Sequence, residues 1–96
     1  MGYKIAPSKR VIKSIKKLSD KRLKAIISDI IFIEIPSDPF KGTAKHGDLA
    51  GIWTWQFKYQ KTDYRIAYQI NQDKIIPILL VGSHENFYDQ LKRLNQ

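Results

Sequence analysis

The sequence predicts a single α+β domain over residues 1–96, with two N-terminal helices packed on a small antiparallel β-sheet and a short C-terminal helix. Three observations predict this class. Apolar residues recur with helical spacing as far as residue 31, alternate with polar residues from residue 52, and return to helical spacing after residue 86. A chain of 96 residues supports one hydrophobic core of modest size.

The first quarter of the chain predicts a short strand and then a helix. Residues 3–6 form the strand, which Pro7 ends, and Ser8 is a suitable N-cap for the helix. The apolar stripe of this helix consists of Val11, Ile12, Ile15 and Leu18. Its lysines lie mostly off that stripe and are expected to face water.

A second helix is expected to begin after Ser19 or Asp20, either of which can cap it. Its stripe consists of Leu23, Ile26, Ile27, Ile30 and Ile31, at spacings typical of one helical face. Pro36 is expected to end the helix, because the residue before a proline is disfavoured in helical geometry. Residues 37–50 carry two glycines and Pro39 and predict an irregular segment.

Residues 53–59 and 64–70 alternate apolar and polar side chains and predict a β-hairpin whose loop is residues 60–63. In this register Tyr59 opposes Tyr64, and Lys58 opposes Arg65. The aromatic and branched side chains then share one face, which should pack on the helices, and the polar face is left open. Two cations placed opposite each other favour a bound anion, although both could also extend into water.

The apolar run of residues 75–81 predicts a third strand, buried on both faces and antiparallel to residues 64–70. This pairing places His84 beside Asp63 and Arg65, at the end of the polar face. A final helix is expected over residues 86–94, with Tyr88 one turn after His84.

These residue types suit metal-free RNA cleavage, in which the ribose 2′-hydroxyl attacks the adjacent phosphate. His84 can exchange a proton near neutral pH, Arg65 and Lys58 can hold the phosphate, and Asp63 can orient the imidazole. Tyr88 or Phe87 can stack on a base. The alternative is a loop histidine that hydrogen-bonds only to backbone. No metal-site or cofactor-binding signature is present.

The net charge of +8 is concentrated at the N-terminus, where residues 1–24 carry nine basic side chains and one acid. This asymmetry favours a polyanionic partner, either RNA or the acidic part of a protein. The candidate contact residues are Lys13, Lys16 and Lys17 on the first helix, with Lys45 and His46 in the irregular segment. The chain has no cysteine and no apolar run that could span a bilayer, so we expect a cytoplasmic protein with no membrane partner.

Three segments resemble the RelE/ParE superfamily of bacterial toxins from type II toxin–antitoxin modules. Residues 47–53 read GDLAGIW, residues 63–70 read DYRIAYQI, and residues 81–88 read VGSHENFY. The helical hairpin and the basic first helix match the same plan, so the likeness covers nearly the whole chain. The resemblance implies a helix-backed antiparallel sheet and a cognate antitoxin that neutralises the toxin by wrapping it.

For the RelE-like branch, the resemblance implies cleavage of mRNA on the ribosome and therefore inhibition of translation. It assigns phosphate contact to Arg65 and proton transfer to His84. Asp63 and Tyr64 match an Asp–aromatic pair of YafQ-like members, Phe87 or Tyr88 matches an aromatic residue, and Lys58 corresponds loosely to basic strand residues. Two alternatives remain: a ParE-like, non-catalytic inhibitor of DNA gyrase, and an inactive RNA-binding module.

Overall fold

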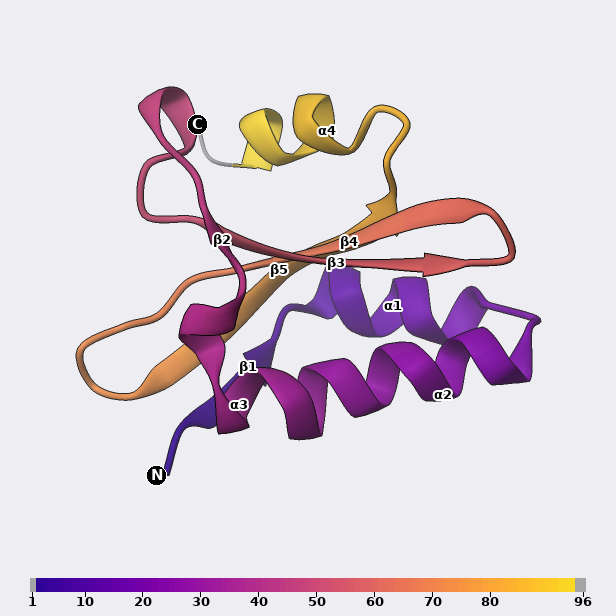
Figure 1. Cartoon of the computed structure of the whole chain (residues 1–96), viewed down its shortest axis with the longest axis horizontal. Helices are drawn as coiled ribbons and strands as arrows, with labels where there is room; N and C mark the ends of the chain where they lie inside the picture. The colour runs from indigo at the N-terminus through magenta and orange to yellow at the C-terminus, as the bar shows by residue number, and fades with distance from the viewer. Residues whose placement is uncertain (1, 95–96) are drawn as a thin grey trace.

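The computed structural model describes residues 2–94, which form three layers (Figure 1). A layer of two helices, α1 (Lys9–Lys17) and α2 (Lys21–Asp29), covers one face of a five-stranded sheet, and α4 (Phe87–Leu94) covers part of the other face. The strands are β1 (Lys4–Pro7), β2 (Thr43–Ala44), β3 (Trp53–Tyr59), β4 (Thr62–Tyr68) and β5 (Ile75–Ser83). None of the helices within residues 2–94 has the length and apolar character needed to cross a membrane.

The predicted caps of the first two helices are confirmed. The Val11 N–H donates to Ser8 Oγ at 3.2 Å, and the Arg22 and Leu23 N–H groups donate to one oxygen of Asp20 at 3.0 and 3.1 Å. These bonds satisfy backbone donors that a helix cannot pair internally. Most of both predicted stripes enters the core, where Val11, Leu23, Ile27, Ile30 and Ile31 are buried against the sheet. Ile12 was predicted to belong to the first stripe but is 40% exposed.

The prediction that Pro36 ends the second helix is wrong. After Asp29 the chain continues through a π-helical turn, η1 (Ile30–Glu34), into α3 (Ile35–Ser37). Ile35 keeps helical angles (φ −60°, ψ −49°), and its N–H bonds back five residues to the Ile30 carbonyl. Pro36 therefore stands at the start of a new helical turn, where its missing N–H is tolerated. The chain leaves the helix only at Asp38.

The sheet has the order β1-β5-β4-β3-β2, and β1 pairs with β5 in parallel. The sheet is therefore mixed, and the prediction of a purely antiparallel sheet is wrong. The three central strands are antiparallel, as predicted. The segment predicted to be irregular contains short 3₁₀ turns, η2 (Pro39–Lys41) and η3 (Gly47–Leu49), and the unpredicted strand β2, which pairs with β3.

The hairpin between β3 and β4 has a two-residue loop, Gln60–Lys61, and not the predicted four-residue loop. Both loop residues are left-handed (φ 48° and 68°), as a tight turn matched to strand twist requires. The register consequently differs by two residues from the prediction. Arg65 opposes Gln56, and Lys58 opposes Asp63, so the predicted pairing of Lys58 with Arg65 is wrong.

A shift of two residues preserves which face each side chain occupies, because side chains alternate along a strand. The predicted apolar face therefore packs on α1 and α2, with Trp55, Ile66 and Tyr68 buried there. The opposite face is not open along its whole length. There Ala67 and Leu80 are buried together with Phe87 and Leu91 of α4.

Candidate functional site

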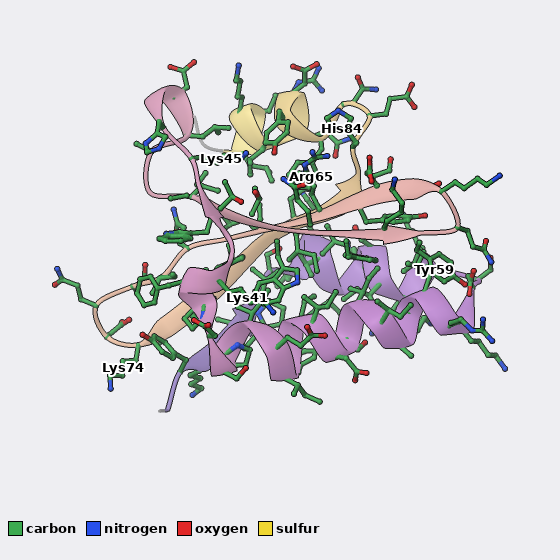
Figure 2. All side chains as sticks on the ribbon, viewed as in Figure 1. Lys41, Lys45, Tyr59, Arg65, Lys74 and His84 are labelled. Carbon is green, nitrogen blue, oxygen red and sulfur yellow. The ribbon has the colours of Figure 1, made fainter. Side chains whose placement is uncertain are left out.

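The α4 side of the sheet gathers four chemically versatile side chains from four separate elements. Arg65 comes from β4, His84 follows the end of β5, Tyr88 lies in the first turn of α4, and Lys45 comes from the segment between β2 and η3. Figure 2 shows Lys45, Arg65 and His84 on this side of the sheet, whereas Lys41 and Tyr59 lie toward the helix layer. We call Lys45, Arg65, His84 and Tyr88 the cationic cluster.

Strand pairing positions His84, as predicted. The His84 N–H donates to the Asp63 carbonyl at 2.8 Å, which continues the β4–β5 ladder past Tyr64 and Ser83. Arg65 opposes Gly82 on the same ladder and therefore meets no side chain from its cross-strand partner. Arg65 Nη1 lies 2.5 Å from His84 Nδ1.

This contact fixes the tautomer of a neutral His84. A guanidinium nitrogen has protons to donate and no lone pair to offer, so Nδ1 must be the acceptor. The imidazole proton is then on Nε2. If Arg65 turns toward a phosphate, Nδ1 is released with its lone pair free to accept a proton.

Tyr88 lies at the centre of the cluster. Its ring centroid is 5.0 Å from the Lys45 ammonium and 5.5 Å from the Arg65 guanidinium carbon, and the His84 ring meets it edge-on at 6.4 Å. Burial raises the pKa of the phenol, but hydrogen bonding and charge from Lys45, the charge of Arg65 and the nearby Thr54 hydroxyl outweigh it, so the pKa of Tyr88 is lowered.

Two buried polar atoms at this place lack ordinary partners. Thr54 is fully buried, and its hydroxyl makes no hydrogen bond of normal geometry, although it lies near enough to Tyr88 to influence that phenol. Arg65 Nε is also buried and unpaired. Sequence reasoning did not identify Thr54, because a threonine in a strand gives no signal until its surroundings are known.

Several predicted site residues lie elsewhere. The Asp63 carboxylate meets Lys58 Nζ at 3.9 Å in an exposed ion pair, so the imidazole of His84 is held by Arg65 and not by Asp63. Tyr64 is on the opposite face, stacked on Phe57 with ring centroids 5.4 Å apart. The Phe87 side chain, at the start of α4, is only 1% exposed and is buried against the sheet. It therefore cannot stack on a base without leaving the core.

The remaining basic candidates are exposed but separate from the cluster. Lys13, Lys16 and Lys17 lie on α1, which covers the other face of the sheet. His46 is exposed at the start of η3 and makes none of the ring or hydrogen-bond contacts that define the cluster.

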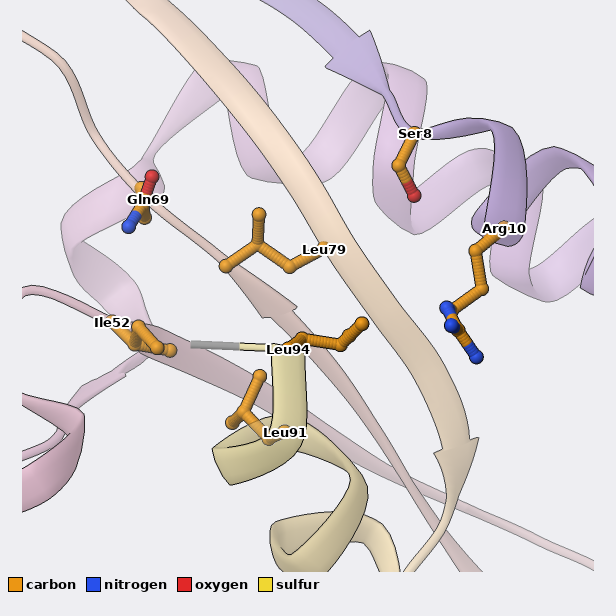
Figure 3. Close-up of a pocket in the computed structure, with 7 residues that line it drawn as sticks. All are labelled: Ser8, Arg10, Ile52, Gln69, Leu79, Leu91 and Leu94. Atoms are coloured by element: carbon orange, nitrogen blue, oxygen red, sulfur yellow. The ribbon is translucent and has the colours of Figure 1, made fainter. Parts of the chain in front are cut away.

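The molecule has surface hollows near and away from the cluster. One of about 400 Å³ lies beside His84 and is lined by Lys61, Thr62, Asp63, Ser83, His84 and Glu85. Another of about 330 Å³ lies between α4 and the start of α1 (Figure 3). Leucines 79, 91 and 94 line the second hollow together with Arg10, and it contains no residue suited to proton transfer. Within residues 2–94, no three histidine or carboxylate side chains gather to hold a metal ion.

The comparisons with known proteins agree with this architecture. The sequence profile of a family described as "ParE-like toxin of type II bacterial toxin-antitoxin system" matches residues 5–92. No curated protein sequence matches the chain significantly.

Solved structures resemble the fold at low sequence identity. A chain of the RelBE2 toxin–antitoxin complex from Mycobacterium tuberculosis has a TM-score of 0.76 and 21% identity, over 88% of this chain and 100% of that one. A free mutant of the E. coli toxin RelE has a TM-score of 0.74 and 17% identity, over 96% and 94%. A chain of the intact E. coli RelBE complex has a TM-score of 0.68 and 20% identity, over 88% and 99%.

Proposed function

This chain belongs to the family of ParE-like toxins of type II bacterial toxin–antitoxin systems, and we propose that it acts as a metal-independent mRNA endoribonuclease on the ribosome. The observation that carries the proposal is the contact between Arg65 and His84, at 2.5 Å, inside a cluster of cations and one phenol. In this arrangement a phosphate-binding group lies directly beside a proton-transfer group. Cleavage of the RNA backbone by its own 2′-hydroxyl needs both.

Arg65 is the residue proposed to hold the scissile phosphate. Its planar guanidinium can bind two phosphate oxygens at once, which a lysine ammonium cannot do. The described contacts of Arg65 are with His84 and Tyr88, and neither is an anion. A bound phosphate would supply the missing negative charge and release His84 Nδ1 in the same movement.

The partners follow from the family and the fold. Two of the similar structures are complexes of a toxin with its antitoxin. We therefore propose a cognate antitoxin for this chain, whose acidic part would meet the basic surface of α1. The ribosome and mRNA are the proposed targets, and the cytoplasm is the proposed location.

The test is mRNA cleavage on programmed ribosomes, mapped by primer extension. The wild-type chain should cut the mRNA, and Arg65→Ala should not, although it should keep the wild-type circular dichroism spectrum. Arg22→Ala is the matched control, because Arg22 lies on α2 on the other side of the sheet. Cleavage by Arg65→Ala at the wild-type rate would remove Arg65 from the site.

The family match also supports a second candidate, a non-catalytic inhibitor of DNA gyrase, as in ParE-like toxins. A supercoiling assay run in parallel separates the two functions. A chain that blocks supercoiling and leaves ribosome-bound mRNA intact would establish the gyrase inhibitor and reject the nuclease. A chain that binds RNA and does neither would be an inactive RNA-binding module.

A further inference from the structure

We propose that the outer face of α2 and η1 is a self-association surface, through which two copies of this chain pair as an antiparallel dimer. The surface consists of Arg22, Ala25, Asp29 and residues 32–34, which recur at spacings of three or four residues and therefore share one side of the helix. It lies in the helix layer, on the opposite side of the sheet from the cationic cluster (Figures 1 and 2). The inference is therefore independent of the proposed nuclease function.

Two neighbouring apolar side chains are exposed on this surface. Phe32 is 53% exposed and Ile33 is 62% exposed, although Ile31 before them and Ile35 after them are buried in the core. Both belong to the π-helical turn η1, which continues α2 along the border of the molecule away from α4 (Figure 1). A second protein surface that covers the pair would remove it from water and would gain the free energy of that burial.

The charges along the same part of the chain are divided between its two ends. Residues 9–24 carry eight basic side chains and one acid, whereas residues 25–40 carry three acids and no basic side chain. On the outer face this division runs from Lys21 and Arg22, in the first turn of α2, to Asp29 and Glu34, and all four residues are exposed. A surface with a basic end and an acidic, apolar end becomes complementary to itself when one copy is reversed.

An antiparallel pairing brings the unlike ends together. With Ala25 of one copy against Asp29 of the other, Arg22 falls beside Phe32 of the second copy. At about 1.5 Å per residue, Arg22 then lies about 4.5 Å along the axis from Asp29 and about 3 Å from Glu34, within reach of its long side chain. The small side chain of Ala25 allows the helices to approach closely, and two-fold symmetry repeats each contact.

A second copy fits this surface better than a partner of uniform charge. A basic partner would be attracted to Asp29 and Glu34 and repelled by Lys21 and Arg22, and an acidic partner would meet the reverse. The net charge of +8 repels two copies at long range. At physiological ionic strength, however, salt screens charges that are more than about 8 Å apart, so the shorter contacts between unlike charges decide the pairing.

The first experiment measures self-association by sedimentation equilibrium at physiological ionic strength. Wild type should show a reversible monomer–dimer equilibrium. A variant that carries both Phe32→Ser and Ile33→Ser should have a dimer Kd about tenfold or more above that of wild type, because two apolar side chains lose their burial. Leu94→Ser is the matched control, since Leu94 is an exposed apolar residue of α4, and it should associate as wild type does. Circular dichroism should show the wild-type helix content in both variants.

The second experiment exchanges charges between the copies. One chain carries Arg22→Glu, and the other carries Asp29→Arg together with Glu34→Arg. Each chain alone should remain monomeric at concentrations at which wild type dimerises, because like charges then meet. An equimolar mixture should recover the dimer, because every contact again joins unlike charges. Arg22→Ala should weaken the dimer and leave mRNA cleavage unchanged, since the dimer surface and the cationic cluster lie on opposite sides of the sheet.

Cysteine cross-linking tests the direction of the pairing. The chain has no cysteine of its own, so two introduced thiols report a single contact. A mixture of Ala25→Cys and Asp29→Cys chains should form a disulfide-linked dimer on mild oxidation, because these two positions face each other. Neither chain should do so alone, since two copies of one position are offset by about 6 Å along the axes as well as separated across them, beyond disulfide geometry.

Each other outcome overturns a defined part of the proposal. If wild type stays monomeric at every concentration, the dimer is rejected, and loss of antitoxin binding by the Phe32→Ser, Ile33→Ser variant would then assign the surface to the antitoxin. If that double variant dimerises as wild type does, the dimer uses a different face. If the mixed charge variants stay monomeric, Arg22 does not meet the acidic residues. If Ala25→Cys chains cross-link to one another, the pairing is not antiparallel.

Discussion

Replacement of His84 tests proton transfer separately from positioning. His84→Ala removes the acceptor of the Arg65 contact as well as the titrating ring, so it disturbs both functions at once. His84→Asn is the sharper change. The amide oxygen of asparagine can accept from Arg65 as Nδ1 does, but an amide cannot take a proton near neutral pH.

A general base ordinarily contributes about 10²–10⁴-fold to a rate. This corresponds to about 2.7–5.4 kcal/mol of barrier, at about 1.36 kcal/mol for each factor of ten. Both His84 variants should therefore lose cleavage by a factor in this range. His84→Asn should do so with Arg65 still anchored, because the amide oxygen of asparagine can replace the Nδ1 acceptor that Arg65 has in the wild-type protein.

The measurement is single-turnover mRNA cleavage on programmed ribosomes, with ribosome binding measured in parallel by co-sedimentation. His46→Ala is the internal comparison and should have the smaller effect, since His46 lies outside the cationic cluster. A His84→Asn protein that cuts as fast as wild type would show that His84 only holds Arg65. A His46→Ala protein that is the slower of the two would move the proton-transfer group to η3.

Three further predictions concern the rest of the molecule. Neutralising the three exposed lysines of α1 should weaken RNA binding and reduce the slope of log K against log salt by about 2 to 3, because three fewer counterions are released on binding. These lysines are Lys13, Lys16 and Lys17. Burial raises the pKa of Tyr68 to about 12, and its hydroxyl donates to the Pro39 carbonyl at 2.6 Å. Tyr68→Phe should therefore lower the free energy of unfolding, measured in urea, by about 1–3 kcal/mol, since a buried carbonyl loses its donor. The backbone N–H of Leu23 and, to a lesser extent, the Tyr59 hydroxyl at 2.8 Å lower the pKa of Asp20 below its ordinary value of 3.8. The stabilising effect of the carboxylate is therefore fully present above that ordinary value and is lost as the pH falls through the lowered pKa of the folded protein. Asp20→Asn keeps a capping side chain, and its free energy of unfolding should therefore fall less than that of wild type between about pH 5 and about pH 3.

Sequence periodicity predicted the helices and strands that bury one regular face. The stripe on α2 and the alternation on β3 and β4 were predicted correctly, because burial on one face imposes the period of the helix or strand. The stripe on α1 was correct except at Ile12, which is exposed. The continuation past Pro36 could not be read in this way. It depends on the π-helical turn before the proline, which places the missing N–H where no helical bond is required.

The hairpin register shows a different limit. Gln60 and Lys61 are not the glycine or asparagine residues that ordinarily announce a tight left-handed turn, so the sequence favoured a longer loop. The error of two residues left the faces intact and changed every cross-strand partner. Proximity of His84 to Arg65 was predicted because it depends on the β4–β5 pairing. Lys45 was predicted only as a residue that contacts RNA, and its approach to Tyr88, like that of Thr54, depends on packing that leaves no periodic signal.

Strand β4 connects the stability of this protein to its proposed chemistry. Ile66 and Tyr68 point into the helix-facing core, and Arg65, which directly precedes Ile66 in the sequence, points to the α4 side. On the helix side, backbone N–H groups at the starts of α1 and α2 are hydrogen-bonded to the capping side chains. On the α4 side, Thr54 Oγ1 and Arg65 Nε are buried without ordinary hydrogen-bond partners. Buried polar atoms are rarely left unpaired, and such exceptions concentrate where a ligand completes the arrangement. The core residues of β4 and Arg65 lie on opposite faces of the strand, so removal of the Arg65 side chain should leave the core intact. A change of register by one residue would exchange the two faces and would destroy the core and the candidate site together.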